Sequence, residues 1–186
     1  MPVMNEVVAP NALFKTRYLS KEKLNLSAED RLDVLDLVYM FEWAFDSRRF
    51  DALSEILTDD VVIDHIFGYR EGKEAALEIL RSQVTSNGLR HQATNPIIFM
   101  NEQGEVSVLS YLFVIKVVNE SAENYPLPAN LAHAVVTDVM RQENGRWKLA
   151  RRTFEQMRVP ENFMSAPQQR LHLEPAASQR AFNHNS

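Results

Sequence analysis

The order of the secondary-structure patterns most constrains this fold, because helical segments come first and long strands follow. Apolar residues recur at helical spacing in three segments, about 27–46, 48–57 and 73–84. Strand patterns then cover a short segment at 61–64 and four longer ones at about 90–100, 105–119, 131–143 and 146–158. Asn144-Gly145 is a typical hairpin turn between the last two. This order predicts an α+β domain whose strongly curved, mostly antiparallel sheet wraps around the N-terminal helices.

Composition limits the size and the partners of this domain. A chain of 186 residues with 45% hydrophobic content suits one domain with a substantial core. The net charge of −5 and the absence of a dense basic run argue against a nucleic-acid partner. Cysteine is absent, which excludes disulfides and thiolate catalysis and is compatible with a reducing cytoplasm, the location we expect.

The two ends of the chain differ from the segment between them. The N-terminus lacks a signal-peptide pattern, and no apolar run approaches the roughly 20 residues that span a bilayer, so no membrane association is expected. Residues 1–26 have no sustained periodicity, and the segment 160–186 is rich in proline and polar residues. We interpret both as arms around a domain at 27–159. They are either disordered or wrapped around a partner.

The first helical segment is expected to be an inner helix. Ser27 and Asp30 form a capping-box pattern at its start. From Val34 to Phe45 the segment is apolar on nearly every face, which predicts packing on two sides. Helical spacing places Tyr39, Trp43 and Asp46 along one stripe, which we expect to face a cavity.

The strand at 106–118 is apolar at both parities, so both faces of the sheet are expected to be covered. One face would form the core and the other a subunit interface. A homo-oligomer is therefore favoured over a monomer.

His91 is the main candidate for chemistry, because it lies at the start of a predicted strand and an imidazole transfers protons near neutral pH. Asp46, at the end of the first helix, would fix the tautomer of this imidazole if the fold brought the two together. A surface or purely structural histidine is the alternative. The sequence alone leaves both roles open.

Several other residues are candidates for lining a substrate pocket. Phe41 and Trp43 would form aromatic walls, and His133 would be either a second polar group in the pocket or a structural residue. Strand alternation sends the neighbours Ser110 and Tyr111, and likewise Arg151 and Arg152, to opposite faces, so that one of each pair could reach the pocket. Asp64 and His65, at the end of the first strand, are expected to face solvent.

Common cofactor motifs are missing. The histidines are scattered, and there is no His-Glu-x-x-His helix, glycine-rich phosphate loop or Gly-x-Ser-x-Gly elbow. We therefore expect neither a metal nor a cofactor.

Five motifs resemble, in their order and spacing, the SnoaL-like branch of the nuclear transport factor 2-like superfamily: FDSRRFDAL at 45–53, LTDDVVID at 57–64, GKEA at 72–75, HQATN at 91–95 and GRWKLARR at 145–152. The resemblance covers roughly residues 28–158. It implies a cone-shaped α+β barrel with a deep apolar pocket, in dimers or trimers.

Within this superfamily, Asp46 and His91 match the aspartate–histidine pair of members similar to scytalone dehydratase and bile acid dehydratase. The resemblance therefore implies acid–base chemistry with His91 as the proton-transferring group and Asp46 as its orienting partner. Those members commonly carry a tyrosine five residues before the aspartate, where this chain has Phe41. Tyr39 either replaces that hydroxyl or packs in the core.

The leading hypothesis is a cofactor-independent lyase or isomerase acting on a small apolar cyclic molecule, such as a polyketide, steroid or terpenoid. Its substrate would contact Tyr39, Phe41, Trp43, Ser110, His133 and Arg152. One alternative is a non-catalytic module of the same fold that binds a hydrophobic ligand or serves assembly. Another is the small subunit of a ring-hydroxylating dioxygenase, because one fold supports many functions.

Overall fold

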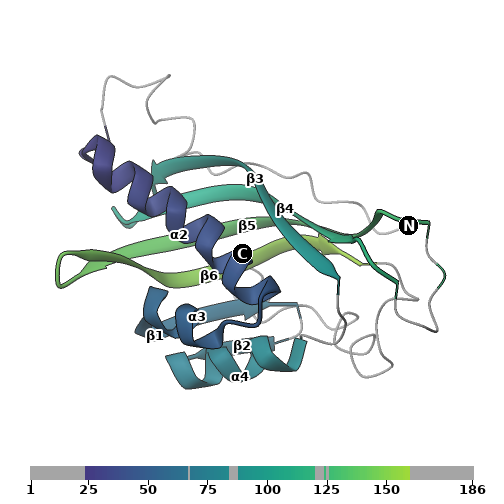
Figure 1. Cartoon of the computed structure of the whole chain (residues 1–186). Helices are drawn as coiled ribbons and strands as arrows, with labels where there is room; N and C mark the ends of the chain where they lie inside the picture. The colour runs from purple at the N-terminus through teal and green to yellow at the C-terminus, as the bar shows by residue number, and fades with distance from the viewer. Residues whose placement is uncertain (1–23, 67, 84–87, 120–123, 125, 160–186) are drawn as a thin grey trace, which may run out of the picture.

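The computed structural model describes residues 24–66, 68–83, 88–119, 124 and 126–159 (Figure 1). Its framework is a six-stranded sheet with strand order β2-β1-β6-β5-β4-β3. The strands are β1 (Leu57–His65), β2 (Gly68–Glu71), β3 (Leu89–Met100), β4 (Val106–Lys116), β5 (Ala129–Glu143) and β6 (Arg146–Arg158). The helices are α2 (Ala28–Asp46), α3 (Phe50–Ile56) and α4 (Lys73–Gln83). The predicted α+β architecture is confirmed. The predicted arms lie outside the described residues, apart from 24–26.

Helix α2 begins at the predicted capping box. The Ser27 hydroxyl accepts from the Asp30 backbone N–H at 3.0 Å, and the Asp30 carboxylate accepts from the Ser27 N–H at 3.2 Å. These two bonds satisfy N–H groups that a helix start otherwise leaves unpaired. Asp30 also accepts from the Trp147 indole at 2.8 Å, which ties the helix start to β6.

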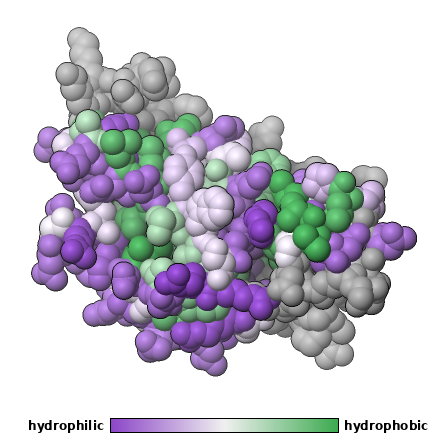
Figure 2. Space-filling model, viewed as in Figure 1, coloured by the Kyte–Doolittle hydropathy of each residue, from purple (hydrophilic) through white to green (hydrophobic). Residues whose placement is uncertain are grey.

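One face of α2 packs on the sheet, and the other is open in the single chain. Val34, Val38, Phe41 and Phe45 are buried against the sheet, as residues at helical spacing are. The opposite face carries exposed Leu32, Met40 and Trp43. In Figure 1 α2 lies across the sheet, and the same view in Figure 2 shows apolar side chains among hydrophilic ones on this face. Of the predicted packing on two sides, the single chain shows only the packing on the sheet.

The hairpins were predicted correctly, but the pairing of β1 was not predictable from local sequence. β3, β4, β5 and β6 pair antiparallel in succession, whereas β1 runs parallel to β6. The predicted short strand at 61–64 is longer in the structure, because β1 begins at Leu57 and includes Thr58-Asp59-Asp60. The short edge strand β2, which pairs antiparallel with β1, is absent from the predicted strands. Within the described ranges, no helix is long and apolar enough to cross a membrane.

Several register shifts interrupt the long strands, and two of them lie at or near a residue with positive φ. The register between β3 and β4 shifts between Thr94 and Ile97, where Asn95 has φ of 52°. The register between β5 and β6 shifts between His133 and Val135, close to Gln156, whose φ is 51°. Bulges of this kind bend the bulged strand and increase its twist, which helps the sheet to curve around α2.

Two separate clusters of buried apolar residues lie on the side of the sheet that carries the helices. The larger cluster joins α2, α3 and α4 to the sheet and includes Phe45, Ile63 and Val108. The smaller cluster lies on the sheet and includes Leu112, Val114, Ala132, Ala134, Val136 and Met157. Phe154 packs against both. We call the side of the sheet that carries these clusters the inner face.

We expect Ser27→Ala to lower the free energy of unfolding by about 1 kcal/mol, because it removes the side-chain acceptor at the helix start. Denaturant unfolding followed by circular dichroism measures this change. Ser47→Ala is the matched control at the other end of α2, where the backbone N–H of Ser47 rather than its side chain makes the cap. Equal losses in the two variants would contradict a specific role of the Ser27 hydroxyl.

Candidate active site

Asp46 and His91 form a doubly hydrogen-bonded pair. The His91 Nδ1 lies 2.6 Å from the Asp46 Oδ1, and the His91 backbone N–H donates to the Asp46 Oδ2 at 2.8 Å. Both oxygens of the Asp46 carboxylate therefore bind the same residue, His91. Because a carboxylate is an acceptor, the imidazole proton belongs on Nδ1 and the Nε2 lone pair is left available.

The fold brings this pair together from 45 residues apart in sequence. Asp46 is the last residue of α2, and His91 lies near the start of β3 on its inner face. The Phe45 ring meets the imidazole edge-on at 5.0 Å between centroids. The His91 side chain is 13% exposed and the Asp46 side chain 8%, so little water competes for the hydrogen bond between them.

A second polar cluster, which the sequence did not reveal, joins the same helix to the sheet. The Arg152 guanidinium donates to both Asp138 oxygens, at 2.7 and 2.9 Å, and to the Glu42 Oε1 at 2.8 Å. All three side chains are buried. The guanidinium carbon also lies 3.8 Å from the centroid of the Phe41 ring. Glu42 is one helical turn before Asp46, so consecutive turns of α2 bind β6 and β3.

Burial and ion pairing have opposing effects on the pKa values of this cluster. Desolvation raises the pKa of Glu42, and the attraction of Arg152 opposes that rise. The two carboxylates nevertheless hold the pKa of Arg152 above its usual value, despite its complete burial. A buried ion that loses its partner typically costs about 3–5 kcal/mol. Each member of the cluster is therefore constrained by the other two.

His65 is a second buried imidazole on the inner face. Its ring meets the Phe154 ring at 4.4 Å between centroids, and it is 7% exposed. Burial, with smaller contributions from the positive charges of His91 and Arg152, lowers the pKa of His65 to about 3. His65 is therefore uncharged near neutral pH. The predicted solvent-facing role of Asp64 and His65 was wrong, because both are buried.

Comparison with known proteins identifies the family. A family model described as a SnoaL-like domain matches residues 26–153. The chain belongs to this family. A search of curated protein sequences gives no significant match for this SnoaL-like chain.

Solved structures share the fold of this SnoaL-like domain. A Nostoc punctiforme protein of unknown function with a cystatin-like fold is 27% identical over 74% of this chain and 96% of its own, with a TM-score of 0.59. ActVI-ORFA from Streptomyces coelicolor is 18% identical over 67% and 94%, with a TM-score of 0.57. LinA is 22% identical over 75% and 95%, with a TM-score of 0.56. The last two support the fold alone.

The SnoaL-like fold brings some of the predicted pocket residues to the inner face. Ser110 is 3% exposed, and its hydroxyl has no hydrogen-bond partner among the described residues. Phe41 is buried but lies beneath the Arg152 guanidinium. Arg152 points inward, whereas Arg151 is exposed. This division follows from strand alternation, as expected.

Three other predicted pocket residues do not face the inner side. Tyr39 and Trp43 are 38% and 69% exposed on the open face of α2, because the helix turns its Val38 and Phe45 side toward the sheet. His133 lies on the other face of the sheet, where its ring contacts Phe113 at 4.9 Å between centroids. Its register partner Phe113 has the parity opposite to inward-facing Leu112 and Val114. The expectation that Tyr39, Trp43 and His133 face the interior was wrong.

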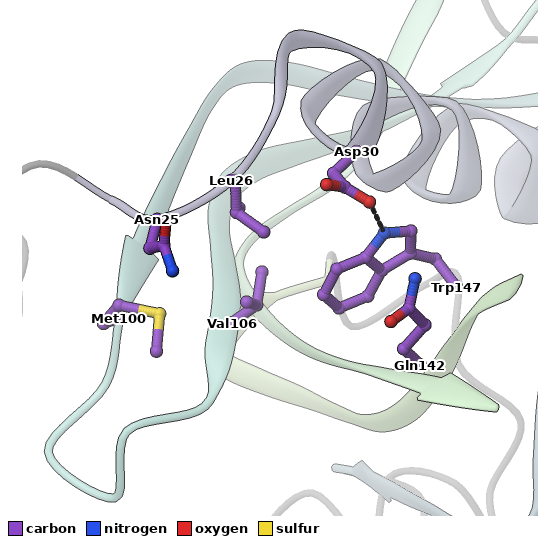
Figure 3. A pocket seen from close by; sticks show the side chains of 7 residues that line it. All are labelled: Asn25, Leu26, Asp30, Met100, Val106, Gln142 and Trp147. Atoms are coloured by element: carbon purple, nitrogen blue, oxygen red, sulfur yellow. Dashed lines mark hydrogen bonds between the residues drawn. The ribbon is translucent and has the colours of Figure 1, made fainter. Parts of the chain in front are cut away.

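A pocket of about 510 Å³ opens at the opposite end of α2 from Asp46. The Trp147 ring and the apolar side chains of Leu26, Val106 and Met100 line it, and Asp30 faces the indole (Figure 3). This pocket does not contain the Asp46–His91 pair. In the part of the chain that the structure describes, no group of three or more histidine and acidic side chains could hold a metal ion.

We expect acid to destabilise the protein through His65. In the unfolded chain this imidazole titrates near pH 6.5, whereas in the folded protein its pKa is about 3. Between these values the unfolded state binds one more proton, so stability falls as the pH falls, by up to about 1.4 kcal/mol per pH unit.

Denaturant unfolding of wild type and His65→Phe between pH 7 and pH 4 measures this contribution. The free energy of unfolding should depend less steeply on pH in the variant than in wild type. His133→Phe removes a histidine from the other face of the sheet and serves as the matched control. A slope that is the same in wild type and His65→Phe would contradict the assignment.

Proposed function

We propose that this SnoaL-like domain is a lyase or isomerase that moves a carbon-bound proton with the Asp46–His91 pair. The observation that carries the proposal is the double hydrogen bond between the two residues. It directs one imidazole nitrogen to the carboxylate and leaves the other for a substrate. This chemistry needs no cofactor, because the pair supplies both the base and the acid.

In the proposed reaction the His91 Nε2 removes a proton from a carbon next to a carbonyl group. The electron pair of the broken C–H bond forms an enol or enolate. In an elimination, this electron pair then expels a hydroxyl group, which takes the proton from the imidazolium and leaves as water. In an isomerisation, the imidazolium returns the proton to another carbon. Asp46 stabilises the imidazolium between the two steps and keeps its ring oriented, as a carboxylate does in a hydrolase triad.

The surroundings of the pair favour a largely apolar substrate with rings. Phe45 contacts His91 directly, and the buried clusters on both sides of His91 are aliphatic and aromatic. A pocket with apolar walls and few polar groups is typical of sites for small molecules. A polyketide, steroid or terpenoid fits this description. Neither the binding-only role nor the dioxygenase-subunit role requires a buried carboxylate that binds both the imidazole and the backbone N–H of one histidine.

We also propose a homo-oligomer, either a dimer or a trimer. On the outer face of the sheet Tyr111 and Ile97, which lie on the paired strands β4 and β3, are 42% and 47% exposed. Trp43 is exposed on α2, on the opposite side of the sheet. Exposed apolar side chains in neighbouring positions are typical of surfaces that contact another chain.

We expect His91→Ala and Asp46→Asn to lower kcat/KM by about 10²–10⁴-fold and to leave the fold intact, because general acid–base catalysis contributes about that much. The assay follows enone absorbance with a panel of fused-ring β-hydroxy ketones. Asp36→Asn, which changes an exposed carboxylate on the same helix, is the matched control and should keep wild-type turnover. Turnover near the wild-type value in either site variant would rule out this mechanism.

A further inference from the structure

The outward side of α2 carries the two most exposed large hydrophobic side chains of the described residues. Trp43 is 69% exposed and Leu32 is 63% exposed, and Tyr39 between them is 38% exposed. With Asp36 they lie along one side of the helix, turned away from the sheet. We call Leu32, Asp36, Tyr39 and Trp43 the outer stripe of α2. Large apolar groups gathered on one surface are typical of a contact with another chain.

The spacing within the outer stripe indicates what kind of surface it contacts. The successive intervals from Leu32 to Trp43 are four, three and four residues. This alternation is the pattern of the positions by which one helix packs along another in a coiled coil. The occupant of the outer stripe is therefore expected to be a helix that runs along α2.

The outer stripe is also complementary to itself when it is reversed. Leu32 and Trp43 are equally far from the midpoint between residues 37 and 38, and so are Asp36 and Tyr39. In an antiparallel pair of identical helices, Leu32 would lie against the partner subunit's Trp43. Asp36 would lie against the partner subunit's Tyr39. A two-fold axis at the midpoint makes each of these contacts twice.

Both contacts in the antiparallel arrangement are chemically matched. The Leu32 side chain packs on an indole ring, which removes apolar surface of both from water. The Tyr39 hydroxyl donates a hydrogen bond and the Asp36 carboxylate accepts one. Neither of these two side chains forms a hydrogen bond or an ion pair with another described residue. They are therefore available to each other across the axis.

Other occupants of the outer stripe fit less well. A parallel pair of α2 helices would place the two Asp36 carboxylates against each other, and like charges at such positions repel. A membrane surface is disfavoured because Glu29 and Asp33 are exposed beside the stripe, and the headgroups of anionic lipids repel acidic side chains. The antiparallel second copy is the arrangement without such a conflict.

We propose that the outer stripe of α2 binds the outer stripe of a second copy of this chain, antiparallel, across a two-fold axis between residues 37 and 38. This inference rests on the homo-oligomer proposed above and assigns its contact surface to α2 rather than to the outer face of the sheet. A two-fold contact joins chains in pairs, so the assembly is a dimer.

Sedimentation velocity of the full chain over a range of concentrations tests the contact. We expect wild type to be a dimer. Leu32→Glu should raise the dimer dissociation constant at least about 100-fold, because it places a carboxylate against the partner's indole ring. Ile97→Glu is the matched control, since Ile97 is an exposed apolar residue on the outer face of the sheet, and this variant should stay dimeric.

A mixture of two variants tests the antiparallel arrangement. We expect Leu32→Glu and Trp43→Lys each to be monomeric, and an equimolar mixture of them to form heterodimers. In the antiparallel pair the new carboxylate at position 32 faces the new ammonium group at position 43, and the remaining Leu32 faces the remaining Trp43. Formation of the heterodimer also shows that both variants fold.

A monomeric or trimeric wild type, a dimer that survives Leu32→Glu, or a mixture that stays monomeric would overturn the inference. Dissociation by Ile97→Glu together with an unchanged Leu32→Glu dimer would leave the homo-oligomer standing and reject the outer stripe as its contact. These masses are measured without a substrate, so a failure of the acid–base mechanism would leave the inference untouched.

Discussion

The contact between the end of α2 and the start of β3 holds together the candidate active site and the joint between helix and sheet. One carboxylate binds both the backbone N–H and the ring Nδ1 of His91. The first bond fixes where the strand begins relative to the helix, and the second fixes the direction of the imidazole. Structure and chemistry thus depend on the same side chain. Preorganisation of this kind lets a proton-transferring group act without reorienting during the reaction.

The Glu42–Arg152–Asp138 cluster has a different physical character. Burial of three charges is costly. Their mutual hydrogen bonds offset that cost, because the Arg152 guanidinium donates to both Asp138 oxygens and to the Glu42 Oε1. The cluster ties α2 to β6 one helical turn from Asp46. With two consecutive turns held by different strands, the helix cannot rotate freely on an apolar surface. This constraint also explains why Tyr39 and Trp43 face away from the sheet.

The sequence predicted what depends on local pattern. The capping box at Ser27, the hairpin at Asn144-Gly145 and the opposite facing of Arg151 and Arg152 all follow from short-range rules, and the family resemblance supplied the pairing of Asp46 with His91. The parallel pairing of β1 with β6 depends on long-range packing that no local pattern encodes. Glu42 and Asp138 escaped notice because each is a single acid in an apolar segment. Their shared partner Arg152 is 110 and 14 residues away in sequence.

The hydrogen bond between Asp46 and His91 can be measured without a substrate. Long-range ¹H–¹⁵N correlation NMR of the histidine side chains, with His91→Gln used to assign the signal, reports which ring nitrogen carries the proton. We expect the neutral His91 ring to be protonated at Nδ1, and we expect this tautomer to lose its dominance in Asp46→Asn. A His91 ring protonated at Nε2, or a tautomer ratio unchanged by Asp46→Asn, would contradict the central claim.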